Sequence, residues 1–210
     1  MFHHKKSIID EEEIATRRLE TLVDGVFAIA MTLLVLDIRL PEAAEMVNSH
    51  DLLLQLLVLA PKFFSFIISF VILGTFWAGH HTEFQYIKKL DHTLIWFNIF
   101  YLLFVSFLPF SASLLGKYTF NQTAVVVYGA NLMMLVAIHY GMWQHARHHK
   151  NLIKENIDKR IDKLVDILGS FAMLAYGLAI VLSFWYLEAS LIIYLLVPLP
   201  YIFGWIYRLV

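Results

Sequence analysis

Six apolar stretches, each about as long as a bilayer is thick, constrain this chain more than any other feature. A hydrocarbon core of about 30 Å takes roughly 20 residues of helix. Because lipid offers the backbone no hydrogen-bond partner, stretches of this length are typical of membrane-spanning helices. The sequence therefore predicts an all-α membrane protein with six transmembrane helices per subunit. The expected spans are about residues 19–38, 61–81, 93–115, 123–143, 164–187 and 190–207.

The first two spans are separated by a shorter apolar stretch. Leu52 to Ala60 is too short to cross a bilayer, and Pro61 after it suits the first turn of a helix. We predict a short interfacial or re-entrant helix there. Residues 1–16 carry a run of acidic residues instead of the apolar core of a signal peptide. We expect a cytoplasmic N-terminal segment at 1–16 and one six-helix domain at 17–210.

Composition excludes several classes of protein. The chain is 60% hydrophobic and 16% charged over 210 residues, which a soluble globule could not bury. Its 16 basic and 17 acidic residues leave no bulk positive surface, so nucleic acid is not an expected partner. With no cysteines, disulfides, thiol catalysis and cysteine metal sites are excluded. We expect no cofactor and no soluble enzymatic activity.

The basic residues predict the orientation, because short cytoplasmic loops collect Lys and Arg. Given six alternating spans, only Arg39 and Lys117 fall on one side, with Lys62 near that boundary. We therefore predict that both termini are cytoplasmic. The other thirteen basic residues share the opposite side: Lys5, Lys6, Arg17, Arg18, Lys88, Lys89, Arg147, Lys150, Lys154, Lys159, Arg160, Lys163 and Arg208.

The first span carries an apolar stripe and one carboxylate. At about 100° per residue, the stripe residues lie within about 60° of Ile29. Ordinary helix packing explains such a stripe most simply. Asp24 lies about 140° from it and should face neighbouring helices, where a carboxylate needs a partner. Arg17, Arg18 and the histidines of the second span are candidates. The stripe consists of Leu22, Gly25, Ile29, Thr32, Leu33 and Leu36.

The second span ends in aromatic and histidine side chains. Trp77 and His81 are spaced i, i+4 and share a helix face, which is also common for residues at a membrane boundary. In the third span, Asn98 is expected to hydrogen-bond across helices, and Pro109 marks a kink or a helix end.

Metal binding is not favoured by the histidine pattern. His80 and His81 are adjacent and diverge around a helix, so with Glu83 they make a poor zinc site. His145 and His149 have the i, i+4 spacing of helical zinc ligands. They lie in a strongly basic loop that repels a cation. The sequence predicts no metal site.

The segment from about Arg17 to Ser113 resembles the transmembrane protein 175 family of potassium channels of lysosomes and prokaryotes. The family hallmark in the first helix is Arg, three variable residues and then Phe-Ser-Asp. In this chain Leu22 and Val23 replace the Phe and the Ser. The residues that match the family hallmarks are Arg18, Asp24, Trp77, His80, His81, Asn98, Pro109 and Phe110.

The resemblance implies a homotetramer in a lipid bilayer, in which the first helix of each subunit lines a central pore. It implies a constriction formed by Ile29, Leu33 and Leu36, with Thr32 contributing to selectivity. The chain has no Thr-Val-Gly-Tyr-Gly carbonyl filter. The permeant ions would be monovalent cations, K⁺ first. The resemblance also implies an interhelical structural network made of Arg18, Asp24, Trp77, His80, His81 and Asn98.

We therefore predict a potassium-permeable cation channel of the cell membrane that conducts passively. A ring of apolar side chains narrow enough to expel water blocks ions, and a small rotation that widens it lets the pore wet. Asp37, near the outer end of the helix, either enriches cations at the outer mouth or is a solvated interfacial carboxylate.

Two other functions use the same residues. A proton- or ion-coupled secondary transporter would titrate Asp24 and His80 or His81. Transporters usually carry internal repeats, and the two halves of this sequence show none. An intramembrane enzyme would depend on Ser65, Ser69, Thr75 and the histidines, although Ser and Thr in spans mostly join helices. We predict that the chain is not an enzyme.

Overall fold

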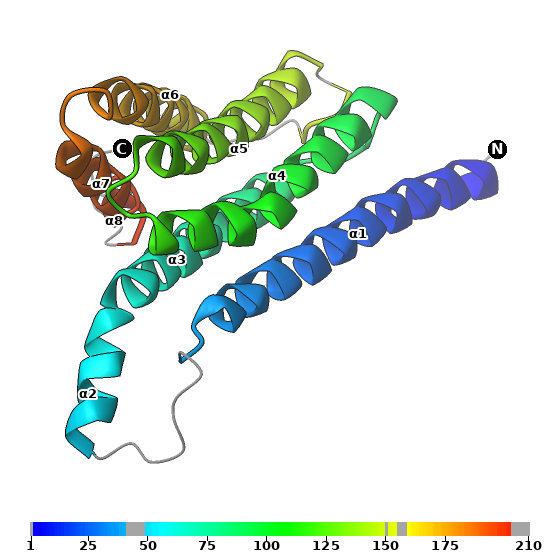
Figure 1. Cartoon of the computed structure of the whole chain (residues 1–210). Coiled ribbons are helices and arrows are strands. Elements are labelled where there is room, and N and C mark those ends of the chain that lie inside the picture. The colour runs from blue at the N-terminus through cyan, green and yellow to red at the C-terminus, as the bar shows by residue number, and fades with distance from the viewer. Residues whose placement is uncertain (1, 41–48, 150, 155–158, 203–210) are drawn as a thin grey trace.

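The computed structural model describes residues 2–40, 49–149, 151–154 and 159–202, and these residues are almost entirely helical (Figure 1). An isolated antiparallel bridge joins Ile87 to Ile153. The all-α prediction is confirmed. The helices are α1 Phe2–Leu33, η1 Leu34–Asp37 (a 3₁₀ helix), α2 Ser49–Val58, α3 Ala60–Phe84, α4 His92–Lys117, α5 Gln122–His148, α6 Lys159–Leu182, α7 Leu187–Leu196 and α8 Leu199–Ile202.

Five helical segments in the described residues are long and apolar enough to cross a bilayer: residues 14–37, 60–84, 92–117, 122–148 and 162–182. They overlap the first five expected spans, although the fourth extends to residue 148 and not 143. The sixth expected span falls on α7 and α8, where the apolar stretch covers only residues 187–202. Its last five predicted residues, 203–207, lie outside the described part of the chain.

Helix ends differ from the predicted ones where apolar content gives no boundary signal. The fifth span ends at Leu182 and not at Leu187, because a turn of exposed aromatic residues, Phe184 to Tyr186, follows it. These aromatics carry no charge that would mark the end of a span, and aromatic residues suit a membrane interface. The first span is α-helical only to Leu33 and continues to Asp37 as a 3₁₀ helix. The short helix before Pro61 is present as α2.

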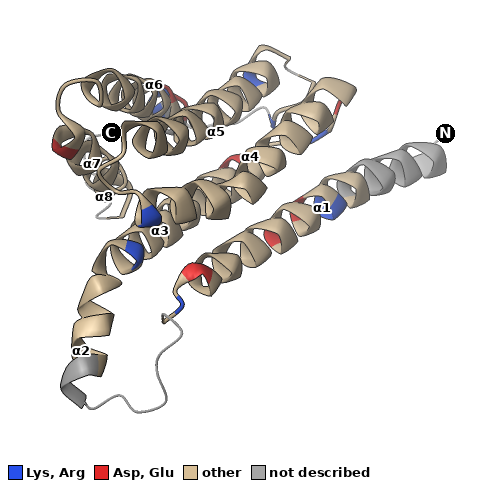
Figure 2. Cartoon of the chain, in the orientation of Figure 1, with Lys and Arg blue, Asp and Glu red and all other residues tan. Residues whose placement is uncertain are grey.

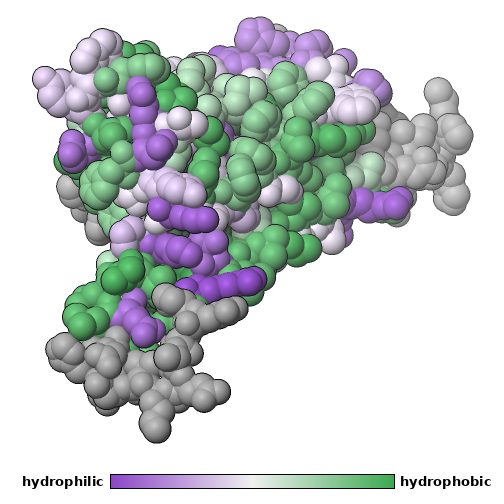
Figure 3. Space-filling view, viewed as in Figure 1, coloured by the Kyte–Doolittle hydropathy of each residue, from purple (hydrophilic) through white to green (hydrophobic). Residues whose placement is uncertain are grey.

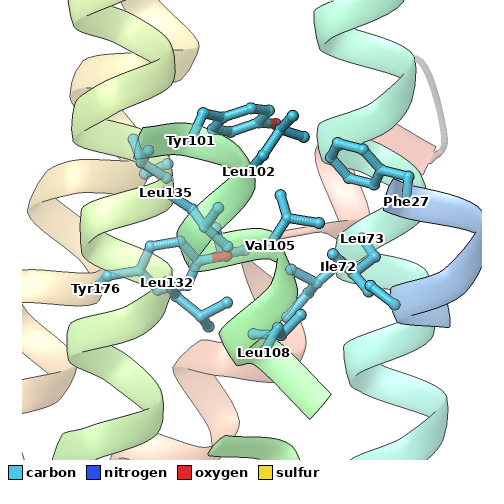
Figure 4. Close-up of a cluster of buried hydrophobic side chains, with 14 of the residues drawn as sticks. Phe27, Ile72, Leu73, Tyr101, Leu102, Val105, Leu108, Leu132, Leu135 and Tyr176 are labelled. Carbon is cyan, nitrogen blue, oxygen red and sulfur yellow. The ribbon is translucent and has the colours of Figure 1, made fainter. Parts of the chain in front are cut away.

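The centre of the molecule is formed by α3, α4 and α5 (Figure 1). On one side α1 packs against α4 and α3, and on the other α6 and α7 pack against α5. Figure 4 shows the buried side chains that fill the interior, including Leu73 of α3, Val105 of α4 and Leu135 of α5. Phe27 of α1 and Tyr176 of α6 reach this cluster from opposite sides. One continuous core therefore joins the first helix to the rest of the subunit.

Two of the basic loops meet at one end of the bundle. The Lys88 amide donates to the Leu152 carbonyl at 2.7 Å, and the Lys154 amide donates to the Tyr86 carbonyl at 2.9 Å. The α3–α4 and α5–α6 connections therefore lie on the same side, as the distribution of basic residues predicts. Figure 2 shows charges along α1 and mainly toward the ends of the other helices, and Figure 3 shows an apolar surface between more polar ends.

An acidic N-cap ties this end together. The Asp91 carboxylate accepts the Leu94 amide at 2.7 Å and lies 2.7 Å from Nε2 of His145 on α5. Partial burial alone would raise the pKa of Asp91, but these two hydrogen bonds outweigh it and lower the pKa below its usual value. The contact fixes the start of α4 against α5.

Candidate pore-lining helix and its contacts

The first helix has one buried face and one exposed face. Val23, Phe27, Ala30 and Leu34 are between 1% and 4% exposed and pack into the core. The exposed face is the stripe predicted from the helical periodicity. Its large apolar members are between 44% and 60% exposed in the single subunit: Leu22, Ile29, Leu33 and Leu36.

Small and polar residues complete the exposed stripe. A Cβ atom added at Gly25 would meet nothing within 4 Å, so another helix can approach closely there. The Thr32 hydroxyl donates to the Ile29 carbonyl at 2.8 Å. This uses its proton and leaves oxygen lone pairs on an exposed side chain. The stripe therefore combines bulky aliphatic groups with one layer of acceptor oxygens.

Asp24 contacts the second span, on the opposite side of the helix from the stripe. Its Oδ1 accepts a hydrogen bond from the Trp77 indole at 2.9 Å. Trp77 stacks on His81, with ring centroids 5.8 Å apart and planes 17° from parallel. The helical wheel predicts this direction, but the partner is an indole N–H and not one of the Arg or His side chains considered from the sequence.

A second polar pair is fully buried between α3 and α4. His80 Nε2 lies 2.9 Å from Asn98 Oδ1, and the two residues are 2% and 0% exposed. Because the Asn98 amide nitrogen donates to the Leu94 carbonyl at 2.9 Å, its oxygen faces His80, and Nε2 carries the proton. The His80 ring also stacks on Phe84, with centroids 4.0 Å apart.

The expected network is thus two separate groups in a single subunit. One is the half-exposed set of Asp24, Trp77 and His81, and the other is the buried pair of His80 and Asn98. Arg18 belongs to neither group: it is exposed, and no polar contact joins it to any residue that the structure describes. A role for Arg18 in the network remains a prediction.

Tyr101 of α4 joins the buried pair to the first helix and was not singled out from the sequence. Its ring is fully buried, lies 5.9 Å from Phe27 of α1, and stacks on His80 at 5.6 Å. Its position three residues after Asn98, on the same helix face, was the available signal. Tyr101 links the buried face of α1 to the His80 and Asn98 pair.

Replacing Asn98 with Ala should destabilise the fold more than replacing Asn131 with Ala. Both amides are buried, but Asn98 satisfies His80, whereas the Asn131 Oδ1 has no hydrogen-bond partner among the described residues. Leaving His80 unpaired adds a penalty of roughly 1 kcal/mol or more. Thermal unfolding of the two purified variants measures the difference. Equal losses would show that His80 gains nothing from Asn98.

The remaining candidate residues have local partners. The Asp37 carboxylate lies 3.7 Å from the Lys62 ammonium, which offsets part of its negative charge. His145 contacts Asp91, and His149 Nδ1 lies 2.9 Å from the His145 carbonyl oxygen. In the part of the chain that the structure describes, no group of three or more His, Cys, Asp or Glu side chains is placed to hold a metal ion.

These features define a multi-span helical membrane protein whose first helix presents an unpartnered apolar stripe. The sequence profile of the family described as endosomal/lysosomal potassium channel TMEM175 matches residues 18–109. A potassium channel of Chamaesiphon minutus is 32% identical over 176 residues, which cover 82% of this chain and 86% of that protein. A potassium channel of a Chryseobacterium species is 31% identical, covering 87% of this chain and 90% of that protein. The chain belongs to the TMEM175 family.

The fold agrees with this assignment. A crystal structure described as a lysosomal potassium-selective channel TMEM175 homolog from Chamaesiphon minutus superimposes with a TM-score of 0.78 at 28% identity. The match covers 90% of this chain and 97% of that one. The matched relatives are named potassium channels and not enzymes, which confirms the prediction that this chain is not an enzyme. The same names favour a channel over the secondary-transporter alternative.

Proposed function

We propose that this chain forms a potassium-permeable cation channel in the cell membrane, as a homotetramer with α1 of each subunit around a central pore and both termini in the cytoplasm. The observation that carries the proposal is the two-faced first helix: its reverse face is 1–4% exposed and its stripe 44–60% exposed. One helix cannot enclose a pore, so the pore requires several copies. Matched relatives are named potassium channels.

The constriction in this proposal is hydrophobic. Side chains of Ile29, Leu33 and Leu36 from each subunit form rings that narrow the pore until water leaves it. An ion could then pass only by losing its hydration shell, and the apolar rings offer no ligand to replace it. A small outward rotation of α1 widens the rings and lets the pore wet. Because η1 begins at Leu34, the rotation per residue changes there, so Leu36 is set by a 3₁₀ turn and not by the α-helical wheel.

Thr32 supplies the selectivity layer. Its hydroxyl proton is held by the Ile29 carbonyl, so lone pairs from four subunits can point toward a passing cation and replace part of its hydration shell. Neutral oxygens of this kind favour a weakly hydrated ion over a strongly hydrated one. One layer gives modest discrimination.

The polar groups outside the stripe hold α1 in place. Asp24, through Trp77, fixes α1 against α3, and the pair of His80 and Asn98 fixes α3 against α4. Val23, which stands where the family has Ser, contributes apolar contact at 1% exposure instead of a hydroxyl. Asp37 sits at the outer mouth, where its pairing with Lys62 weakens the attraction for cations.

A liposome flux assay on the purified protein tests the proposal. We expect potassium flux without an added ionophore, larger than sodium flux under a matched gradient. Thr32→Ala should lower the potassium-to-sodium ratio, by about twofold for one layer of oxygens. Thr119→Ala is the matched control, because Thr119 also donates to a carbonyl of the preceding turn, that of Leu115, but lies in the turn that follows α4 and not on α1. No flux of either ion through folded, inserted protein would refute the channel.

A further inference from the structure

A cavity of about 470 Å³ is lined by residues of α3, α5, α6 and the α7–α8 end and by none of α1. In Figure 1, α6 and α7 lie on the opposite side of the molecule from α1. Its volume falls within the range of about 300–1,000 Å³ of sites that bind small organic molecules. Most of its wall is aliphatic or aromatic, including Val71, Val136, Leu168 and Ala172. None of the candidate pore or network residues lines it, so the cavity is unrelated to the stripe of α1.

The polar groups in the wall converge on one carboxylate. Glu83 is 8% exposed. Among the described residues that line the cavity, it is the only acidic or basic residue apart from His139. His139 Nε2 lies 3.0 Å from Glu83 Oε2, but the contact lacks hydrogen-bond geometry and Nε2 has no hydrogen-bond partner among the described residues. A buried carboxylate beside an unsatisfied imidazole nitrogen is costly without a further partner.

Most of the other polar side chains of the wall already donate to protein oxygens, whereas no hydrogen bond joins the Tyr176 hydroxyl to another described residue. The Thr82 hydroxyl donates to the Ala78 carbonyl at 2.8 Å, and the Tyr140 hydroxyl donates to Asp166 at 3.1 Å. Among the described residues of the wall, the acidic acceptor is therefore Glu83. A carboxylate in apolar surroundings attracts a cation and repels an anion.

We propose that this cavity binds a small amphiphilic amine, with the ammonium on Glu83 and an alkyl or aromatic body in the apolar part. Its ammonium forms a charge-assisted hydrogen bond to the carboxylate, and its body removes apolar surface from water. At 470 Å³ the cavity is near the lower end of the small-molecule range, which suits a single short chain and not a two-chain lipid.

Two glycines of α3 line the cavity, and the missing side chain has a different effect at each. A Cβ atom at Gly74 would meet nothing within 4 Å, so a Leu side chain there would extend into the cavity without a backbone clash. A Cβ atom at Gly79 would press on His139 Cε1 at 3.2 Å, so the absence of a side chain lets His139 lie against α3. Gly74 therefore offers a way to fill the site, and Glu83 a way to neutralise it.

The test is photolabelling of the full chain in phosphatidylcholine bilayers with a diazirine-bearing octylamine. We expect labelled peptides from α3, α5 or α6, and displacement by excess octylamine but not by octanol or octanoate. Glu83→Gln, which keeps the shape and removes the charge, should weaken competition roughly tenfold. Gly74→Leu should abolish labelling, whereas Gly74→Ala, too small to fill the space, should retain most of it.

Specific results would overturn the site. These are labelling confined to α1 or α4, equal competition by octanol, or unchanged labelling in folded Glu83→Gln and Gly74→Leu proteins. Displacement by phosphatidylethanolamine but not by octylamine would refute the small-molecule assignment. Potassium flux is not part of the readout, so the cavity and the channel proposals stand or fall separately.

Discussion

Replacing Ile29 with Asn should raise potassium leak through the reconstituted protein roughly tenfold. Ile29 is the most exposed of the large apolar residues on the stripe, at 60%. In the proposed tetramer four Asn amides would form the ring, and each would hydrogen-bond to water that aliphatic side chains expel. A tenfold rise corresponds to a barrier to ion passage that is lower by about 1.4 kcal/mol. This is less than the ~2–7 kcal/mol that one polar group without a hydrogen-bond partner costs in apolar surroundings.

The control for this experiment is a similar substitution away from the first helix. Ile167 on α6 is 47% exposed, so Ile167→Asn places the same amide on another exposed apolar surface. We expect this variant to conduct like the unmodified protein. Leu33→Asn, about one helical turn from Ile29, should raise leak as well. Unchanged flux in well-folded Ile29→Asn protein would remove Ile29 from the constriction.

The exposed stripe was predictable because it depends on a single helix. Periodicity places Leu22, Ile29 and Leu33 on one side of any α-helix, whatever surrounds it. The same reasoning placed Asp24 on the side that meets a neighbouring helix, and its hydrogen bond to Trp77 agrees. The spans were predictable for a related reason: about 20 apolar residues have few alternatives to a helix in lipid.

Contacts between helices were not predictable in this way. The residue type of Trp77 predicts a position at a membrane boundary. Its hydrogen bond to Asp24 depends on the position of α1 beside α3, which the sequence pattern does not give. Glu83 and His139 are 56 residues apart and meet only through the packing of α3 and α5. The end of α6 was misplaced because Phe184 to Tyr186 continue the apolar pattern through a turn. Pattern gives the direction of a side chain but not its partner.

Replacing Asp24 with Ala should disturb the placement of α1 without changing the conductance of an open pore. The Trp77 indole would lose its acceptor, and hydrogen bonds to charged groups contribute about 1.5–3 kcal/mol. Because Asp24 is exposed in the single subunit, we take the lower end of this range. That energy corresponds to a roughly tenfold shift of the equilibrium away from the assembled, open channel. Single-channel recording measures open probability and unitary conductance separately.

Two further variants separate the hydrogen bond from the charge. Asp24→Asn keeps an oxygen for the Trp77 N–H, so it should retain part of the function that Asp24→Ala loses. Trp77→Phe removes the donor, and if the bond is the reason for the effect, the double variant should be little worse than either single one. Additive losses would mean that Asp24 and Trp77 act through different partners. A fall in unitary conductance for Asp24→Ala would instead place its carboxylate in the ion pathway, which contradicts its position about 140° from the stripe.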